Sequence, residues 1–567
     1  MGTATVEGGG RHKRWFVPRS HHVRKAEVSP GRSCAAQMTR PAEDATLRRS
    51  LESAIGPEKV RMDDATRRTY STDASPCAVE PRAVAFVERE EEVLAVLRVC
   101  RELDVPLTPR ASGTSLSGAA IGAGVVMDTT RFKRLLEFDP ARGLVRVEPG
   151  ILLSELNTHL AERGMRLAPD PGSQDLCRIG GMVGHNASGY RSVKYGQTGD
   201  HVLELKVVLA DGTSVRAHDV RLDSPEWAEV TGRAEALERV RREIDESREA
   251  ILSSRRPIRK HSSGYNLVGL AESIAHGVFP LASLFVGSEG TLGIVTEATL
   301  RVLPIPAQRV TLLLYLDRFE ELGPAVAEIL AWGPSAIEAV DGGSLALLDR
   351  EALGVPPTAQ AMLLVEFDDG DLAAIADGVV GRIRSRYRLS QAAEVAFDTA
   401  RQSALWKVRR AVFPTIIQRP GPRKAWGFVE DPIVPRDRVP EFIEFLAGLA
   451  RRHGTEAGIY GHIGDGNTHY RPFFDPTDPA DFERMQALRI EFDDAVLDRF
   501  RGAPSGEHGI GRIRAETLPR VWGPEVYGVM LRIKEALDPR GLLNPGVMLS
   551  TDSWWATWGG LESRMPM

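Results

Sequence analysis

PRASGTSLSG, residues 109–118, is the stretch of sequence that decides the fold of this chain. Its glycines let the backbone approach a ligand closely, and its serines and threonine add hydroxyl groups to a row of backbone N–H groups. Such a nest of N–H groups binds anions, so the loop fits a cofactor that carries a pyrophosphate. Taken alone, a loop of this composition is more often a flexible connection. It is also not the Rossmann fingerprint, because no G-x-G-x-x-G lies between a strand and a helix here.

The residues around this loop predict a domain that is built largely of loops. Residues 83–87 predict a strand, and residues 90–103 predict a helix with one apolar face. Residues 106–199 are then crowded with Gly, Ser, Thr and Asn, interrupted by short strands at 124–127 and 144–147. Loops of this length are uncommon in a compact domain unless they carry a function, so we expect a bound ligand.

The composition indicates a globular protein with at least two domains. Its 567 residues exceed the roughly 250–300 residues at which a single hydrophobic core stops growing. The net charge of −5 gives no basic surface for nucleic acid. Cys34, Cys77, Cys100 and Cys177 are too far apart for a disulfide framework or an iron–sulfur cluster, which favours a reducing compartment. No apolar run reaches the ~18 residues that a membrane span needs.

The pattern along the chain predicts where the domains begin and end. The first forty residues carry eight Lys or Arg and no continuous apolar stretch, which excludes a secretory signal. We interpret residues 1–42 as a disordered basic arm; a transit peptide or a start at Met38 would also fit. Residues 43–304 form the expected first domain, with a charged helical excursion at about 225–265. Strands and amphipathic helices in residues 305–548 predict a second, α+β domain, followed by a tail over residues 549–567.

Four further motifs lie downstream of the loop, namely DPGS at 170–173, IGGMVGHNASG at 179–189, YG at 195–196 and GSEGTLGI at 287–294. In this order they resemble the FAD-binding domain of the vanillyl-alcohol oxidase/p-cresol methylhydroxylase superfamily, over roughly residues 64–304. Thr114 stands where covalent members carry a histidine, so the resemblance implies non-covalent FAD. The contacts that it implies are Pro109, Arg110, Ala111, Ser112, Gly113, Thr114, Ser115, Gly118, Pro171, Gly172, Ser173, Gly180, Gly181, Asn186, Ser188, Gly189, Tyr195, Gly196, Glu289, Gly290, Gly293, Ile294 and Asn544.

The string GHIGDGNTH, residues 461–469, predicts a hairpin that carries two histidines. Asp465-Gly466 is a strong turn signal, and a four-residue loop from 464 to 467 would set His462 opposite His469 on one face. Two imidazoles so placed can share one divalent ion such as Zn²⁺ or Mn²⁺, with Glu507 as the candidate third ligand. Each histidine could instead be a hydrogen-bonded structural imidazole.

Together with GEHGIG at 506–511 and LNPG at 543–546, this string resembles the C-terminal domain of FAD-linked D-lactate, glycolate and D-2-hydroxyglutarate dehydrogenases. The resemblance covers about residues 310–548 and implies an α+β, ferredoxin-like domain. It implies that His462, His469 and Glu507 hold a metal, that His508 removes the substrate's hydroxyl proton and that Arg409 binds its carboxylate. The expected reaction is oxidation of a small D-2-hydroxy acid, D-lactate-like, by hydride transfer to flavin N5.

Two departures from the family weaken a hydroxyglutarate assignment. Arg471 stands where those enzymes carry an asparagine, and we count it with Arg409 as an expected substrate-binding residue. Residues 429–432 lack the lysine that they use on the distal carboxylate. The sequence also leaves open a glycolate dehydrogenase, an alcohol or sugar-lactone oxidase, a non-redox alkyl-glycerone-phosphate synthase, and a silent subunit that only carries electrons on FAD.

The partners expected from the sequence are small molecules and an electron acceptor. The chain has no cysteine motif for a cluster of its own, so a separate iron–sulfur protein, a cytochrome or a quinone would take the electrons. We also expect a homodimer and a cytoplasmic location, with or without peripheral contact at the inner face of the membrane.

Overall fold

The computed structural model describes residues 34–558, with side chains from residue 42 onward. The chain divides into two units, residues 1–46 and 47–567. Helix α1 runs over Cys34–Ile55, so the last part of the expected basic arm is helical, while residues 1–33 of that arm lie outside the described residues. All features described below belong to residues 47–558.

The first part of this unit begins with a four-stranded sheet in the order β1-β2-β4-β3. Strands β2, β4 and β3 are parallel, and the apolar face of α3 packs on them through Val93, Val96, Leu97 and Cys100. The loop from residue 111 to 124 therefore starts at the carboxyl end of β3. The bounds are η1 Pro57–Lys59, β1 Val60–Arg61, α2 Asp64–Tyr70, β2 Ala83–Phe86, α3 Glu90–Leu103, β3 Leu107–Arg110 and β4 Val125–Asp128.

A second, antiparallel sheet in the order β5-β6-β12-β8-β9 completes the first part. Its central strand β12 alternates buried and half-buried residues, which is the period of a strand with one face on the core. The bounds are β5 Leu135–Asp139, β6 Leu144–Val147, α4 Leu153–Ala161, β7 Met165–Arg166, α5 Ile179–His185, α6 Ser192–Tyr195, η2 Thr198–His201, β8 Val202–Val208, β9 Ser214–Ala217, β12 Ile294–Arg301 and β13 Leu303–Pro304.

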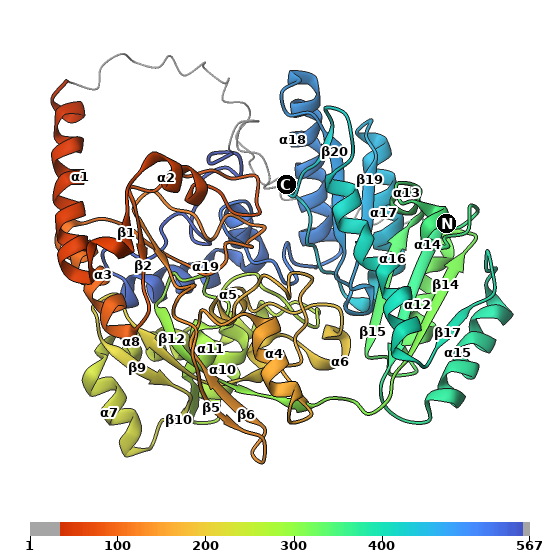
Figure 1. Ribbon diagram of the computed structural model, residues 1–567, viewed down its shortest axis with the longest axis horizontal. Helices are drawn as coiled ribbons and strands as arrows, with labels where there is room; N and C mark the ends of the chain where they lie inside the picture. The colour runs from red at the N-terminus through yellow and green to blue at the C-terminus, as the bar shows by residue number, and fades with distance from the viewer. Residues whose placement is uncertain (1–33, 559–567) are drawn as a thin grey trace, which may run out of the picture. The chain divides into compact units, whose positions relative to one another are not determined.

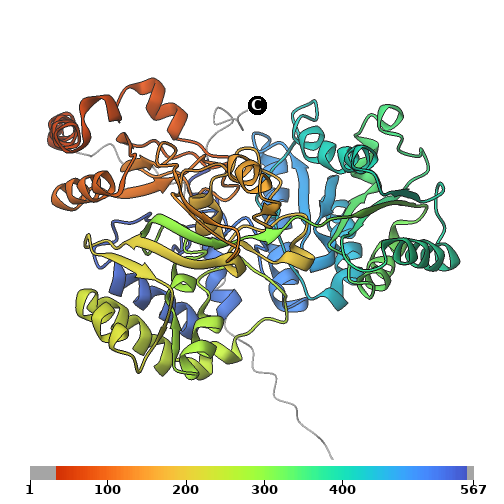
Figure 2. The ribbon, with the colours of Figure 1, turned by 60° about the horizontal axis from the view of Figure 1, so that its bottom comes forward.

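The expected helical excursion consists of four helices joined to a short strand pair. Its helices are α7 Pro225–Arg233, α8 Glu235–Glu246, α9 Arg248–Ser253 and α10 Leu267–Ala275, with β10 Asp219–Arg221, β11 Val278–Pro280 and α11 Leu281–Phe285 around them. Helix α8 packs against α19, Leu518–Leu537, which lies near the other end of the chain (Figure 2). The segment that contains α19 thus packs on the first part, although it follows the second part in the sequence.

The second part is a seven-stranded antiparallel sheet in the order β17-β14-β16-β15-β19-β20-β18 (Figure 1). In β14 the side chains of Leu312, Leu314 and Leu316 pack with helices α12, α15 and α17, while Leu313 and Tyr315 pack with α16. Both faces are covered, so the strand is apolar at every position except Thr311, which is also buried. This sheet and its helices confirm the α+β class.

The bounds in the second part are β14 Val310–Leu316, η3 Phe319–Glu321, α12 Leu322–Leu330, β15 Ala336–Asp341, α13 Gly342–Ala346, α14 Arg350–Leu353, β16 Ala361–Phe367, α15 Leu372–Arg386, β17 Glu394–Ala396, α16 Thr399–Ile417, β18 Lys424–Ala425, η4 Arg436–Arg438, α17 Val439–Arg452, β19 Ala457–Gly461, η5 Ile463–Asp465, β20 His469–Phe474, α18 Pro479–Asp494, η6 Ala495–Arg499 and η7 Ala515–Thr517.

The expected C-terminal tail is packed where the structure describes it. Trp554 is buried and stacks on Phe428, with ring centroids 5.3 Å apart, and Trp558 packs on Trp426. Residues 559–567 lie outside the described residues. No helix in the described range 34–558 is long and apolar enough to cross a membrane.

Candidate active site

A cavity of about 580 Å³ lies between the loops of the first part and the sheet of the second. This is within the range of roughly 300–1,000 Å³ that is usual for ligand sites. Seventeen of the expected flavin contacts line it: Pro109, Arg110, Ala111, Ser112, Gly113, Thr114, Ser115, Pro171, Gly172, Ser173, Gly180, Gly181, Ser188, Glu289, Gly290, Gly293 and Ile294. The same cavity is lined by Arg409, His462, His469, Arg471, Glu507 and His508.

The wall of the cavity has the backbone geometry that a dinucleotide needs. Gly113 and Gly290 both have φ of 70°, a conformation that residues with a side chain rarely adopt. A Cβ on Gly290 would lie 2.6 Å from Cγ of Pro109, so only glycine lets these two loops meet. The expected flavin loops therefore form one continuous surface that fits FAD.

Six of the expected flavin contacts are not among the residues that line the cavity, and their contact with FAD stays a prediction. Asn186 ends α5 and accepts a hydrogen bond from Gly199, Asn544 bonds to Thr108, Ala119 and Glu289, and the hydroxyl of Tyr195 donates to Asp368. The three glycines have close neighbours instead: Gly118 lies beside the side chain of Cys77, Gly189 beside the backbone of Asp170 and Gly196 beside the side chain of Asp200. These residues shape the loops that carry the contacts.

The hairpin exists, but its register differs from the expected one. Strands β19 and β20 pair so that Tyr460, and not His462, lies opposite His469. The connection is longer than four residues because residues 463–465 form a 3₁₀ turn that closes on Gly466, whose φ is 82°. His462 therefore precedes the turn, and the two imidazoles meet edge to face, with ring centroids 5.2 Å apart.

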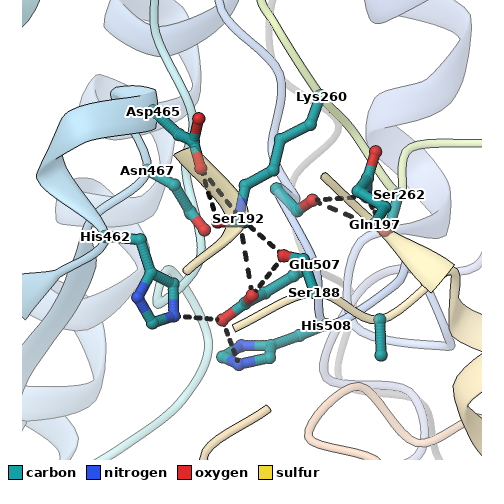
Figure 3. A network of polar contacts seen from close by, with 12 residues as sticks. Ser188, Ser192, Gln197, Lys260, Ser262, His462, Asp465, Asn467, Glu507 and His508 are labelled. Atoms are coloured by element: carbon teal, nitrogen blue, oxygen red, sulfur yellow. Dashed lines mark hydrogen bonds and ion pairs between the residues drawn. The ribbon is translucent and has the colours of Figure 1, made fainter. Parts of the chain in front are cut away.

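The side chains of His462, His469 and Glu507 converge on one point. Oε1 of Glu507 lies 2.8 Å from Nε2 of His462 and 3.6 Å from Nε2 of His469. All three residues are buried, and Figure 3 shows His462 directed at the carboxylate. The expected ligand set is thus brought together, although its members come from two separate segments of the chain.

The donor set fits a divalent ion. Burial, with the neighbouring imidazoles, lowers the pKa of His469 well below its usual value, so this ring is neutral, as a ligand must be. Its Nδ1 is buried without a hydrogen-bond partner among the described residues. Burial would also lower the pKa of His462, but the carboxylates of Glu338 and Glu507 outweigh it and raise that pKa to about 10. A cation between His462 and Glu507 would take the place of that proton.

A second grouping of possible ligand atoms overlaps the first. Asp431, His469, Glu507 and His508 offer atoms that lie within 4.8 Å of one another. Asp431, however, already accepts hydrogen bonds from the backbone N–H of Glu507 and of His508, and from Ser505 and Asn467. Its oxygens are engaged in shaping the turn, so His462 is the better third ligand.

His508 is held by two acidic residues that follow each other in the chain. Its Nδ1 lies 2.8 Å from Oε1 of Glu430, and its backbone N–H donates to Asp431 at 2.8 Å. Nε2 lies 3.6 Å from Oε1 of Glu507 and so faces the convergence point of the metal candidates. Burial would lower the pKa of His508, but Asp431 and Glu430 outweigh it and raise that pKa. The ring can accept a proton at Nε2.

Both expected substrate-binding arginines line the cavity, and each is paired with a buried glutamate. Nε of Arg409 donates to Glu338 at 2.8 Å, and the guanidinium carbon lies over the rings of Tyr190 and Tyr460, 5.4 and 5.1 Å from their centroids. Nη2 of Arg471 donates to Glu430 at 2.8 Å. Among the described residues no protein group accepts from the terminal nitrogens of Arg409, which leaves them for a ligand.

Two glutamates that sequence reasoning missed join these groups. Glu338 accepts from Arg409 and contacts Nδ1 of His462 at 2.6 Å, while Glu430 contacts His508 and accepts from Arg471 and Arg514. Both stand among buried apolar neighbours, Glu338 inside β15 and Glu430 after Phe428 and Val429. A buried charge needs a partner, so a glutamate within an apolar stretch was the signal that the sequence offered.

The comparisons with known proteins agree with this arrangement. An FAD binding domain matches residues 81–218, and the C-terminal domain of FAD linked oxidases matches residues 305–548. The chain is similar to glycolate oxidase subunit GlcD of Escherichia coli, with 30% identity over 505 residues that cover 87% of this chain and 89% of that protein. It is also similar to D-lactate dehydrogenase of Anaerostipes hadrus, with 28% identity over 521 residues, 87% of this chain and 95% of that protein.

Solved structures share the fold. The structure of p-cresol methylhydroxylase with substrate bound aligns with a TM-score of 0.64 at 14% identity, covering 90% of this chain and 97% of that chain. The expected type of FAD-binding domain is thereby confirmed.

Proposed function

Because the chain belongs to the family of FAD-linked dehydrogenases of 2-hydroxy acids, we propose that it oxidises a small D-2-hydroxy acid, similar to D-lactate, to the 2-oxo acid. The observation that carries the proposal is that the flavin loops, two arginines, His508 and the three metal candidates all line one cavity. One cavity can therefore bind the substrate carboxylate, accept its hydroxyl proton and bring its carbon next to the flavin.

The carboxylate of the substrate is bound by arginine in this proposal. Glu338 holds Nε of Arg409, which lines the cavity and whose terminal nitrogens would bind the carboxylate. A planar guanidinium can bind a carboxylate through two parallel hydrogen bonds. The rings of Tyr190 and Tyr460 lie against that guanidinium, which supports a substrate with a short side chain. The choice of the D configuration rests on the relative that is a D-lactate dehydrogenase.

The hydroxyl proton is removed by His508. A hydroxyl group is too weak an acid to ionise unaided near neutral pH, so oxidation of its carbon needs a base. Glu430 holds Nδ1 of His508, and Nε2 is the atom that faces the cavity. His508 is thus positioned to accept the proton at Nε2, and Glu430 stabilises the imidazolium that results.

His462, His469 and Glu507 would hold a divalent metal, Zn²⁺ or Mn²⁺, and the loops at 109–115 and 287–294 would hold FAD without a covalent bond. When bound, FAD accepts the two electrons and the metal polarises the substrate hydroxyl. Glu338 fixes the ring orientation of His462 from the far side, as partners behind a ligating histidine usually do.

The electrons leave to a separate acceptor in this proposal. Of the described cysteines, Cys77, Cys100 and Cys177 are buried and apart, so they form no cluster with one another. An iron–sulfur protein, a cytochrome or a quinone would reoxidise the flavin. We also propose a homodimer.

The test is steady-state turnover of the purified protein with an artificial dye as acceptor and with paired D- and L-2-hydroxy acids. D-lactate or another short D-acid should reduce the dye, and the L-isomers should not. Equal turnover of both isomers, or turnover of alcohols without a carboxylate, would contradict the proposal.

A further inference from the structure

Lys260 is a buried lysine that the reaction described above does not use. It lies in the segment between α9 and α10. Its side chain is 4% exposed, and Figure 3 shows it directed at the centre of the polar network. Nζ lies 2.6 Å from Oγ of Ser188 and 3.0 Å from Oγ of Ser192. An ammonium group buried among such partners must be held by them, because its desolvation is costly.

Each of the two serines passes this contact on to a carboxylate. A serine hydroxyl can accept one hydrogen bond and donate another. Ser188 accepts from Lys260 and donates to Oε2 of Glu507 at 2.6 Å. Ser192 accepts from Lys260 and donates to Oδ2 of Asp465. Nζ itself lies 3.5 Å from the same oxygen of Glu507 and 3.6 Å from that of Asp465.

The two oxygens of Glu507 therefore have different surroundings. Oε1 faces the imidazoles of His462, His469 and His508, while Oε2 faces Ser188 and Lys260. A carboxylate held in this way can offer one oxygen to a metal ion without rotating.

Asp465 links the same lysine to the histidines. It lies in the turn η5, three residues after His462 and four before His469. Lys260 thus contacts both segments that bring metal ligands, the turn of the hairpin and the segment after Gly506. It comes from a third segment, in the first part of the chain.

We propose that Lys260 is a positioning residue that fixes Glu507 and the hairpin turn relative to each other, so that the ligand atoms are placed before the metal binds. The inference rests on the proposed metal site. Its ammonium group offsets two buried carboxylates, and the two serines set their directions. Loss of partners behind a metal ligand typically weakens metal affinity 10–100-fold, which is the effect expected when Lys260 is lost.

The experiment measures the affinity of the FAD-loaded protein for Zn²⁺ by competition with a chelator. Lys260→Met should weaken Zn²⁺ binding 10–100-fold while FAD content stays at the wild-type level. Lys260→Gln should also weaken it, and it provides the measurement if the methionine variant is insoluble. Lys260→Arg should recover most of the affinity. Lys534→Met is the matched control, because Lys534 is a partly buried lysine that binds Asp538 and the carbonyl of Thr291 instead.

A second readout reports geometry directly. With Co²⁺ in place of Zn²⁺, the visible spectrum of the bound ion should change in Lys260→Met and stay unchanged in Lys534→Met. His462→Ala serves as the reference that removes a ligand. If His462→Ala loses the metal while Lys260→Met binds Zn²⁺ with wild-type affinity, the role of Lys260 is wrong. If His462→Ala also keeps the metal, the proposed metal site is wrong, and the inference about Lys260 is wrong with it.

Discussion

His508→Gln separates the base from the rest of the site. The substitution removes Nε2, the proton acceptor, but it leaves the backbone N–H that donates to Asp431 and the backbone carbonyl that accepts from Ser117. The turn should therefore keep its shape. The metal candidates lose the ring stacked on His469 and the approach of Nε2 to Glu507, but Glu507 keeps its hydrogen bonds to His462 and Ser188, so FAD and metal content should be unchanged.

The expected size of the effect follows from the role of a general base, which typically contributes 10²–10⁴-fold to the rate. At about 1.36 kcal/mol for each factor of ten, this corresponds to roughly 2.7–5.4 kcal/mol of transition-state stabilisation. The loss should appear in kcat with little change in KM, because the proton is removed in the transition state.

The assay is anaerobic stopped-flow reduction of the bound flavin by substrate. His185→Gln is the matched control: His185 lines the same cavity, but burial lowers its pKa to about 4, and its Nδ1 has no hydrogen-bond partner among the described residues. The control should reduce its flavin within a few-fold of the wild-type rate. If His508→Gln reduces flavin at the wild-type rate while His185→Gln does not, the base has been assigned to the wrong residue.

Substitution of Glu430 gives a second test of His508 as the base. A hydrogen bond to a charged group contributes about 1.5–3 kcal/mol, so Glu430→Gln should slow flavin reduction roughly 10–100-fold. In the His508→Gln background it should add little, because Glu430 acts on the proton through His508. Thermal unfolding must be measured alongside, because Arg471 and Arg514 also lose a charged partner.

Three other predictions concern binding. His462→Ala or His469→Ala should remove the metal and most turnover while FAD stays bound; metal analysis beside the flavin spectrum checks this, and full activity in a chelated, metal-free protein would contradict it. Acid precipitation should release the flavin into the supernatant, because Thr114 offers no covalent attachment; yellow pellets would show otherwise. Arg409→Lys keeps the charge but loses the planar group that binds Glu338. Its increase in KM should exceed its decrease in kcat by a factor of roughly 10–100; an unchanged KM would exclude Arg409 from substrate binding.

Much of the fold could be predicted from local sequence patterns. The mostly apolar runs at 310–316 and 361–367 form the neighbouring strands β14 and β16, because a strand that is covered on both faces is largely apolar, and the one buried charge, Glu366, is paired with Arg191. The helix expected at 90–103 has those bounds in the structure. The spacing of apolar residues is a local property, so it can be recognised without knowledge of the tertiary structure.

The excursion after residue 225 shows where local patterns fail. The sequence predicts a charged helical excursion at about 225–265, but its pattern does not show that the helix breaks between α8 and α9 at Ser247, whose ψ is 13°. Packing of α8 on α19, almost 300 residues away in sequence, determines which face is buried there. No property of residues 225–265 alone contains that information.

The sequence predicted which residues meet at the candidate site, but it predicted their geometry only in part. His462, His469, Glu507 and His508 meet as expected, but the pairing of Tyr460 with His469 shows that a turn signal does not fix strand register.

The residues that the sequence did not reveal act through long-range contacts. Glu338, Glu430 and Lys260 reach the site from a buried strand, a loop and the far part of the chain. Glu338 is 124 residues from His462 in sequence, Glu430 is 78 residues from His508, and Lys260 is 247 residues from Glu507. A buried charge signals that a partner exists, but only the structure identifies it.

The central claim is that the bound flavin takes electrons from a 2-hydroxy acid. The most direct measurement mixes the purified protein with D-lactate in the absence of oxygen and of any acceptor, and follows the visible absorbance of oxidised flavin. We expect the band to disappear in a single turnover, with one 2-oxo acid formed per flavin, and L-lactate to leave it intact. A flavin that stays oxidised with every D- and L-2-hydroxy acid would contradict the account and would favour a subunit that only carries electrons.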